Sequence, residues 1–303
     1  MTTPLRHILV PTDFSDAAEH ALLYAASLGE RYGATIHVIH VVTLQDVDRS
    51  DDTNFPDMAP YLDRADAAAR QALDAGAEHG GEAEATVVKE VLRSVNPHEA
   101  IIEYAGDKAI DLVVIAMRGR SRLSYMLLGS VTERVVRYAP CPVLVVEKGD
   151  RDFVDPATGA VNVNKVVIAH DLSDRAQRAL TYTVERMAPY EPELHLVHVV
   201  ESDVPSAYAD VGVQSSFSGI PDLKQRLEQA LGNRAADVAP EGWKVVCHVT
   251  EGKVHKKVNG YAADQRADLL VVGSESRRSL AERLVGGTAE QIIRHAPCPT
   301  LIA

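Results

Sequence analysis

Short apolar runs alternate with longer polar-faced stretches along the whole chain. "HILVP" (7–11) is an apolar run of branched residues, whereas "SDAAEHALLYAASLGERYG" (15–33) starts at a candidate serine N-cap and ends at a glycine, as helices do. The same alternation continues to residue 146. It predicts strands at 7–11, 34–42, 84–92, 111–117 and 142–146. It predicts helices at 15–33, 61–80, 96–109 and 130–139.

This order of elements predicts a fold class. Continuous apolar strands joined by helices are typical of a parallel sheet that is buried on both faces. Within the third helix, Asn96 is the expected cap and Pro97 the first helical residue. We therefore expect an open, doubly wound, mainly parallel five-stranded α/β sheet of the Rossmann-like type.

The second half of the chain repeats the first. Asp13 in "VPTDFSDAAEHAL" recurs 158 positions later as Asp171 in "IAHDLSDRAQRAL", and "RYAPCPVLVV" (137–146) recurs as "RHAPCPTLIA" (294–303). Such a period indicates a tandem duplication of one fold. The predicted domains are 1–148 and 163–303, joined by a connection at 149–162 that contains glycine, proline and aspartate without periodicity.

Composition narrows the class of protein. With 46% hydrophobic and 24% charged residues the chain is an ordinary globular protein, and its net charge of −12 disfavours nucleic-acid binding. Three cysteines, two of them in Pro-Cys-Pro contexts, do not suggest a disulfide framework. The first residues lack a secretory signal, and no apolar run approaches the roughly 18–20 residues that cross a bilayer. We expect a cytoplasmic protein without membrane partners.

Candidate binding residues follow the strands, because ligands of such sheets bind at the carboxyl ends near the reversal of strand order. The fourth predicted strand is followed by "MRGRSRLSYMLLGS" (117–130), in which nine residues separate Gly119 from Gly129, and Ser130 opens a helix. Backbone N–H groups, a hydroxyl and the positive helix end would form a phosphate site there. The alternative is that Gly129 only allows close packing and Ser130 only caps the helix.

Charge supports the phosphate interpretation. Residues 117–128 contain Arg118, Arg120 and Arg122 and no acidic residue. Such a cluster favours an anion even in an acidic protein.

Other chemistries find less support. His37 and His40, and likewise His195 and His198, are three positions apart on predicted strands, so their side chains would point to opposite faces. Packed or capping histidines are therefore favoured over a metal site. The sequence has no nucleophile elbow, P-loop or dinucleotide fingerprint, and we assign no catalytic residue and no metal ligand.

Over nearly all of both halves the chain resembles a tandem universal stress protein, on "VPTDFS", the glycine-rich loop and "RYAPCPVLVV". Nucleotide-binding members of that family carry Gly, two residues, Gly, nine residues, Gly and Ser or Thr, where this chain has Ala116, Gly119, Gly129 and Ser130. The resemblance implies that Asp13 holds the ribose or adenine and that the backbone of Val41 contacts adenine. With flanking positions, the candidate nucleotide-binding residues are Pro11, Thr12, Asp13, Val41, Ala116, Met117, Arg118, Gly119, Gly129, Ser130 and Val131.

The second half departs further from the family pattern. Its second glycine position is Ser276, and its hydroxyl, on Thr288, comes one place late. Its loop 274–285 has three arginines against two glutamates, so its phosphate field is weaker. For Asp171 the alternative is a turn or N-cap acceptor. The second-half candidates are Asp171, Val199, Gly273, Gly286 and Thr288.

These observations lead to a prediction of function. The chain is expected to be a stress-response regulatory protein that binds ATP or a related adenine nucleotide, with or without magnesium, mainly in its first half. The alternative is a nucleotide-free interaction scaffold with degenerate pockets. Binding is favoured over catalysis because no nucleophile or metal-holding carboxylates are evident, although slow ATP hydrolysis stays open. The final strands 142–146 and 299–303 are expected to pair the domains within the chain, and a homodimer is left open.

Overall fold

The computed structural model describes residues 5–43, 86–119, 128–149, 151–201, 217, 220, 222–274 and 287–303. The chain divides into two compact units, Met1–Asn162 and Val163–Ala303, and each is described by itself. The helix expected at 61–80 lies outside the described residues. Within the described part, no helix is long and apolar enough to cross a membrane.

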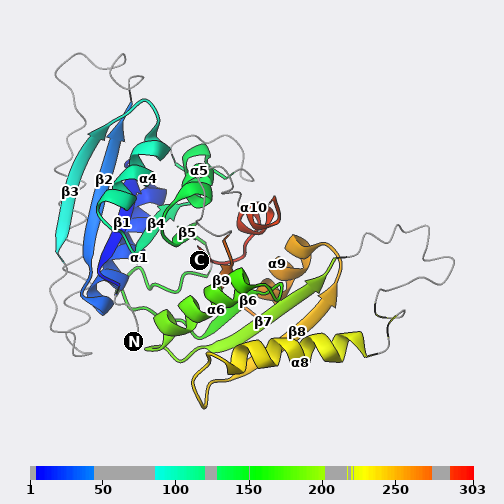
Figure 1. The fold of residues 1–303 in the computed structure, drawn as a ribbon. Coiled ribbons are helices and arrows are strands. Elements are labelled where there is room, and N and C mark those ends of the chain that lie inside the picture. The colour runs from blue at the N-terminus through cyan, green and yellow to red at the C-terminus, as the bar shows by residue number, and fades with distance from the viewer. Residues whose placement is uncertain are drawn as a thin grey trace, which may run out of the picture. The chain divides into compact units, whose positions relative to one another are not determined.

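The first unit is a parallel sheet whose strand order is β3-β2-β1-β4-β5 (Figure 1). The order reverses between β1 and β4, which are neighbours although two strands separate them in the chain. The expected open, doubly wound α/β sheet is confirmed. The strands are β1 (His7–Thr12), β2 (Thr35–Val42), β3 (Val87–Arg93), β4 (Leu112–Ala116) and β5 (Val143–Val146).

Helices cover both faces of this sheet. Helix α1 (Asp16–Tyr32) packs on β1 and β4, while α4 (Pro97–Asp107) packs on β2 and against α5 (Ser130–Tyr138). Because crossovers between parallel strands are almost always right-handed, we expect α1 on one face and α4 and α5, which contact each other, on the other. The central strands β1 and β4 are consequently buried from both sides, as their apolar sequences predict.

The helix ends follow from local sequence. Ser15 caps α1 by accepting a hydrogen bond at 3.2 Å from a backbone N–H of the first turn, and Gly33 ends the helix in the left-handed conformation with φ 63°. Asn96 and Pro97 take the expected places at the start of α4. The Asn96 side chain does not cap the helix, because its Nδ2 donates to Glu99 Oε2 at 2.9 Å instead.

The second unit repeats this arrangement with the strand order β8-β7-β6-β9-β10, again parallel, so β6 and β9 flank the reversal. The strands are β6 (Lys165–Ala169), β7 (Glu193–Val200), β8 (Val245–Glu251), β9 (Leu269–Val272) and β10 (Thr300–Ile302). The helices are α6 (Asp174–Met187), α8 (Leu223–Ala236), α9 (Val254–Asp264) and α10 (Gly287–Arg294). The expected pairing of the two final strands stays a prediction.

Residues 152–162, most of the expected connection, pack on the first unit. Asp152 Oδ1 accepts hydrogen bonds at 2.9 Å from both Tyr24 Oη and His20 Nε2 on α1. The next residue, Phe153, is buried edge-on against the Tyr24 ring, with centroids 4.7 Å apart. The segment folds back through a single antiparallel bridge between Val154 and Val161. It therefore contributes to the core of the first unit.

Candidate functional site

The first candidate site lies at the carboxyl ends of β1 and β4, where the strand order reverses. Thr12 ends β1 and Asp13 follows it, while Ala116 ends β4 and is followed by the segment 117–119. Because these strands are direct neighbours, residues about a hundred positions apart come together at one edge. This is where open parallel sheets bind ligands.

A tight turn fixes the carboxylate of Asp13. Its Oδ1 accepts hydrogen bonds from the backbone N of Ser15 at 3.1 Å and from the Ser15 hydroxyl at 2.6 Å. Between them Phe14 adopts a positive φ of 62°, and its backbone N donates to Thr12 Oγ1 at 3.0 Å. One oxygen of Asp13 thus serves as a turn acceptor, and the turn sets the direction of the other.

Gly119 lies against the second oxygen of Asp13. A methyl group built on Gly119 would overlap Asp13 Oδ2 and would lie 3.3 Å from Asp13 Cγ. A side chain at position 119 would therefore have to displace the Asp13 carboxylate, so glycine is favoured here by space and not by backbone conformation. The contact joins the segment after β1 to the segment after β4.

The N-terminus of α5 closes against the same edge. Gly129 is its N-cap, and Ser130 is the first helical residue, so Ser130 is not the cap. The Gly129 backbone N donates to Met117 O at 3.0 Å, and a Cβ at Gly129 would lie 3.3 Å from that oxygen. Thr132 Oγ1 donates to Ala116 O at 2.8 Å. Gly129 has an ordinary φ of −60°, so a glycine here permits the close approach of two segments and is not needed for backbone conformation.

One of the three arginines expected to attract an anion at this edge has an acidic partner. Arg118 forms an ion pair with Glu147, the residue after β5. Its positive charge is therefore partly neutralised. Arg120 and Arg122 lie outside the described residues. Val41 is half-buried near the end of β2, and Val131 is half-buried in the first turn of α5.

Two histidines hold the aspartates Asp13 and Asp171 in position, although the sequence had assigned neither histidine to a site. His40 Nδ1 donates to Thr12 O at 2.8 Å, and His198 Nδ1 donates to His170 O at 2.9 Å. Each bond ties the carboxyl end of the first strand of a unit to the second strand, one residue before the aspartate. The recurrence of this histidine at equal spacing in both halves is the sequence signal that could have indicated this role.

The other histidine of each strand has different partners. His37 Nδ1 lies 3.0 Å from Tyr104 Oη, and His195 Nδ1 lies 2.8 Å from Tyr261 Oη. Burial lowers the pKa of both His37 and His195 below the usual 6.5. The two histidines on each strand therefore bind separate groups.

The second candidate site is a cavity of about 200 Å³ in the second unit. It lies at the carboxyl ends of β6, β7 and β9, so its place in the unit matches that of the first site. Gly286 and the loop residues Glu275, Ser276, Arg277, Arg278, Glu282 and Arg283 lie outside the described residues. The cavity brings together four second-half candidates, Asp171, Val199, Gly273 and Thr288.

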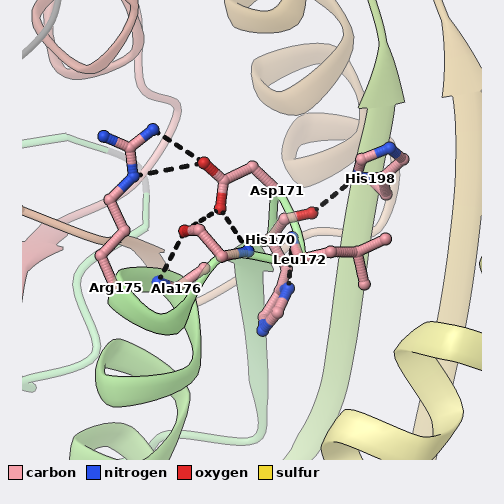
Figure 2. Close-up of polar contacts among 7 residues, drawn as sticks. His170, Asp171, Leu172, Arg175, Ala176 and His198 are labelled. Carbon is pink, nitrogen blue, oxygen red and sulfur yellow. Dashed lines mark hydrogen bonds and ion pairs between the residues drawn. The ribbon is translucent and has the colours of Figure 1, made fainter.

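Asp171 is held on both oxygens. Oδ1 accepts hydrogen bonds from the backbone N and hydroxyl of Ser173, as Asp13 does from Ser15. Oδ2 accepts from Arg175 Nη2 at 2.7 Å and Nε at 3.2 Å (Figure 2). Burial raises the pKa of Asp171, but the hydrogen bonds from Ser173 and Arg175 outweigh it and lower that pKa to about 2.

Gly273 has a packing role. A Cβ there would lie 3.3 Å from both the Cα and the backbone N of Ala176, in the first turn of α6. The first unit has Ala116 at the corresponding position, and its methyl group is buried. The end of β9 thus approaches α6 closely.

Comparison with known proteins gives the family. The model of the universal stress protein family matches residues 4–147 and 162–303. A universal stress protein of Methanocaldococcus jannaschii is 32% identical over 148 residues, which are 48% of this chain and 85% of that protein. One of Synechocystis sp. is 23% identical over 317 residues, covering 98% of this chain and 99% of that protein.

Solved structures agree on the fold. The crystal structure of a universal stress protein from Archaeoglobus fulgidus matches with a TM-score of 0.63 at 24% identity, covering 99% of this chain and 96% of that chain. The family model matches twice along the sequence. The chain belongs to the universal stress protein family and carries two copies of its domain in tandem.

Proposed function

We propose that the first unit binds ATP or a related adenine nucleotide, and that the protein acts as a stress-response regulator through this binding. The observation that carries the proposal is the contact of Gly119 with Asp13. A carboxylate fixed by Ser15 lies beside a residue without a side chain, so a ligand can approach both the carboxylate and the backbone of the segment after β4.

The residues around this contact suit the parts of a nucleotide. The Asp13 carboxylate would accept hydrogen bonds from ribose hydroxyls, and the backbone of Val41 would contact adenine. The phosphates would lie at the N-terminus of α5, where Ser130 offers an exposed hydroxyl and the helix offers unpaired N–H groups. ATP supplies the negative charge that this helix end favours.

Magnesium would arrive with the nucleotide. Among the described residues no group of three or more histidine, cysteine, aspartate or glutamate side chains could hold a metal ion. Magnesium is commonly held by nucleotide phosphates with only one or two protein ligands. Binding without turnover is the simplest activity for this arrangement, since phosphoryl transfer also needs a positioned nucleophile.

Titration calorimetry with ATP tests the proposal, with wild type compared to Asp13→Ala and Gly129→Val. Wild type is expected to bind. Asp13→Ala should weaken binding by about 1–3 kcal/mol, because it removes a charged hydrogen-bond acceptor. Gly129→Val should remove most of the binding, because its Cβ would lie 3.3 Å from Met117 O and its branched methyl groups would enter the approach to the phosphates.

The result that would overturn the proposal is equally specific. A wild-type protein that gives no heat with ATP, and does not compete for a fluorescent ATP analogue, would favour the nucleotide-free scaffold. Circular dichroism of each variant shows whether it is folded. Mass spectrometry of small molecules released from freshly purified, denatured protein gives an independent reading of what is bound.

A further inference from the structure

We propose that Arg134 on α5 recognises the phosphate end of the nucleotide in the first unit, and that His98 on α4 holds its guanidinium there without neutralising its charge. This role rests on the proposed function, because it concerns the same ligand at the same site. Arg134 then determines the preference of the site for ATP over adenosine. The sequence pointed instead to the loop arginines Arg118, Arg120 and Arg122.

Arg134 lies on the same face of α5 as Ser130. The two residues are four positions apart in the helix, and residues at this spacing are neighbours on a helix surface. Side chains of a helix lean toward its N-terminus, so Arg134 lies over the turn that begins at Ser130. That turn carries the exposed hydroxyl and the unpaired N–H groups of the proposed phosphate site. The arginine is thus about 6 Å along the helix axis from the first of these groups.

His98 fixes the position of the guanidinium. Arg134 Nη1 donates a hydrogen bond to His98 Nε2 at 3.2 Å. His98 is the second residue of α4, and α4 begins after β3, at the same edge of the sheet as the candidate site. The guanidinium is therefore held at the carboxyl ends of the strands and not beside the later turns of α5.

The histidine that holds Arg134 is uncharged. An arginine has only donors, so His98 Nε2 must be an unprotonated acceptor. Burial and the charge of Arg134 lower the pKa of His98 below its usual 6.5, against an opposite effect of Glu99, so the neutral ring is present at neutral pH. Glu99 Oε1 lies 3.9 Å from the same nitrogen, but its side chain is 57% exposed and water screens its charge. The imidazole therefore orients the guanidinium and leaves it positive.

Two neighbouring arginines differ from Arg134 in this respect. Arg118 forms an ion pair with Glu147, and Arg137 Nη2 lies 3.3 Å from Glu133 Oε1. Among the residues that the structure describes, Arg134 forms no ion pair with a carboxylate. Its charge is consequently available to an anion at the start of α5.

The fold does not require an arginine at this position. In the second unit Gln291 takes the place of Arg134, and His255 takes the place of His98. Helices α9 and α10 nevertheless pack against each other, as α4 and α5 do. Packing of the two helices therefore does not need the charge, whereas a phosphate at the start of α5 accounts for it.

Titration calorimetry of the full chain with ATP and with adenosine separates the two parts of the ligand. Arg134→Gln should weaken ATP binding by about five- to tenfold, because it removes a charge beside the phosphates, and adenosine binding by less than about twofold. Glutamine is the residue that the second unit carries there, so the fold should stay intact. Arg134→Lys keeps the charge and a donor for His98, so it should lose less than about threefold for ATP.

Lys108→Gln is the matched control. It removes the same charge from the opposite end of α4, where Lys108 is the C-cap. It should change ATP binding by less than about twofold. Salt gives a second measurement, because the difference between wild type and Arg134→Gln should shrink as salt rises from about 0.05 M to about 0.5 M. A loss caused by altered packing would not follow the salt concentration in this way.

His98→Leu tests the positioning role of the histidine. Leucine cannot accept a hydrogen bond, so ATP binding should weaken by about two- to threefold while adenosine binding stays unchanged. Combined with Arg134→Gln it should cause no further loss, because the two residues act as one unit. His98→Gln keeps an acceptor oxygen for Arg134 and should bind ATP within about twofold of wild type. Additive losses in the double variant would overturn this role of His98. Circular dichroism checks that each variant is folded.

The outcomes distinguish the role of Arg134 from the proposed function. If wild type binds ATP and Arg134→Gln binds it equally well, or loses ATP and adenosine affinity alike, the role of Arg134 is wrong and the proposed function stands. If wild type binds adenosine as tightly as ATP, the role is also wrong, because the phosphates then add nothing. If wild type binds neither probe, both proposals are overturned. A loss confined to ATP and restored by Arg134→Lys supports both.

Discussion

His40 Nδ1 donates a 2.8 Å hydrogen bond to the backbone oxygen of Thr12, which ties the carboxyl end of β1 to β2 one residue before Asp13. The His40 ring also lies against Phe14, with ring centroids 4.4 Å apart. The turn that orients Asp13 is thus held from the side by a residue that need not touch a ligand. His40 is a positioning residue in this view.

His40→Phe should weaken ATP binding and lower the free energy of unfolding by about 0.5–1.5 kcal/mol. Phenylalanine retains an aromatic ring beside Phe14 but cannot donate to Thr12 O. Calorimetry and urea unfolding measure the two effects. His198→Phe is the matched control, because it breaks the equivalent bond in the second unit. A loss of ATP affinity of similar size in both variants would contradict a local role for His40.

Gly119→Ala should reduce ATP affinity, because the added methyl group would overlap Asp13 Oδ2 and displace the carboxylate. Gly106→Ala is the control, since a Cβ on Gly106 meets no atom within 4 Å. Gly106 lies within α4, so its replacement by alanine should stabilise the protein by up to about 1 kcal/mol. Equal ATP affinity in the two variants would show that the Gly119 contact does not matter for binding.

Tyr24→Phe should destabilise the first unit by about 1–3 kcal/mol. The substitution leaves Asp152, whose side chain is only 14% exposed, without one of its two donors from α1. It also removes the hydroxyl that accepts from the backbone N of Phe153 at 3.2 Å. Urea unfolding measures the change. Asp155→Asn in the same segment is exposed and keeps its acceptor oxygen, so its effect should stay within about 0.5 kcal/mol.

The buried His37 should make stability fall in mild acid. Its pKa is lowered in the folded protein, chiefly by burial, so between that value and the usual 6.5 the unfolded chain binds more protons. The free energy of unfolding therefore keeps the whole contribution of His37 above about pH 6.5 and decreases as the pH falls below that value. His37→Gln should make this decrease shallower from about pH 7 to about pH 5. Urea unfolding at constant ionic strength measures the slopes, and identical slopes would exclude the contribution of His37.

Local and repeated patterns predicted most of the fold. The apolar runs of the first half placed β1 to β5, and the serine and glycine at the ends of α1 placed that helix, because such signals act within a few residues. The duplicated sequence predicted two similar units. The expectation that site residues gather at the carboxyl ends followed from the parallel sheet alone.

The features that the sequence did not predict depend on contacts between residues far apart in the chain, or on a side chain that has a choice of partners. Nothing near Asp152 in the sequence indicates that it binds Tyr24 and His20, more than a hundred residues earlier. The Asp171–Arg175 pair has a visible spacing of four, but that spacing cannot tell whether an arginine points to solvent or back to the residue before its helix. Gly129 allows the start of α5 to approach the segment after β4, and only the folded structure shows how close the two segments come.

The packing of residues 152–162 on α1 determines where the chain can be divided into separately expressed halves. A recombinant first half that stopped after β5 would discard Asp152 and Phe153 and leave Tyr24 and His20 facing water, so its low stability would be an artefact of truncation. Carrying the fragment on to Asn162 keeps these groups paired. Chimeras that exchange the repeats should therefore be joined after Asn162, where the next residues enter β6.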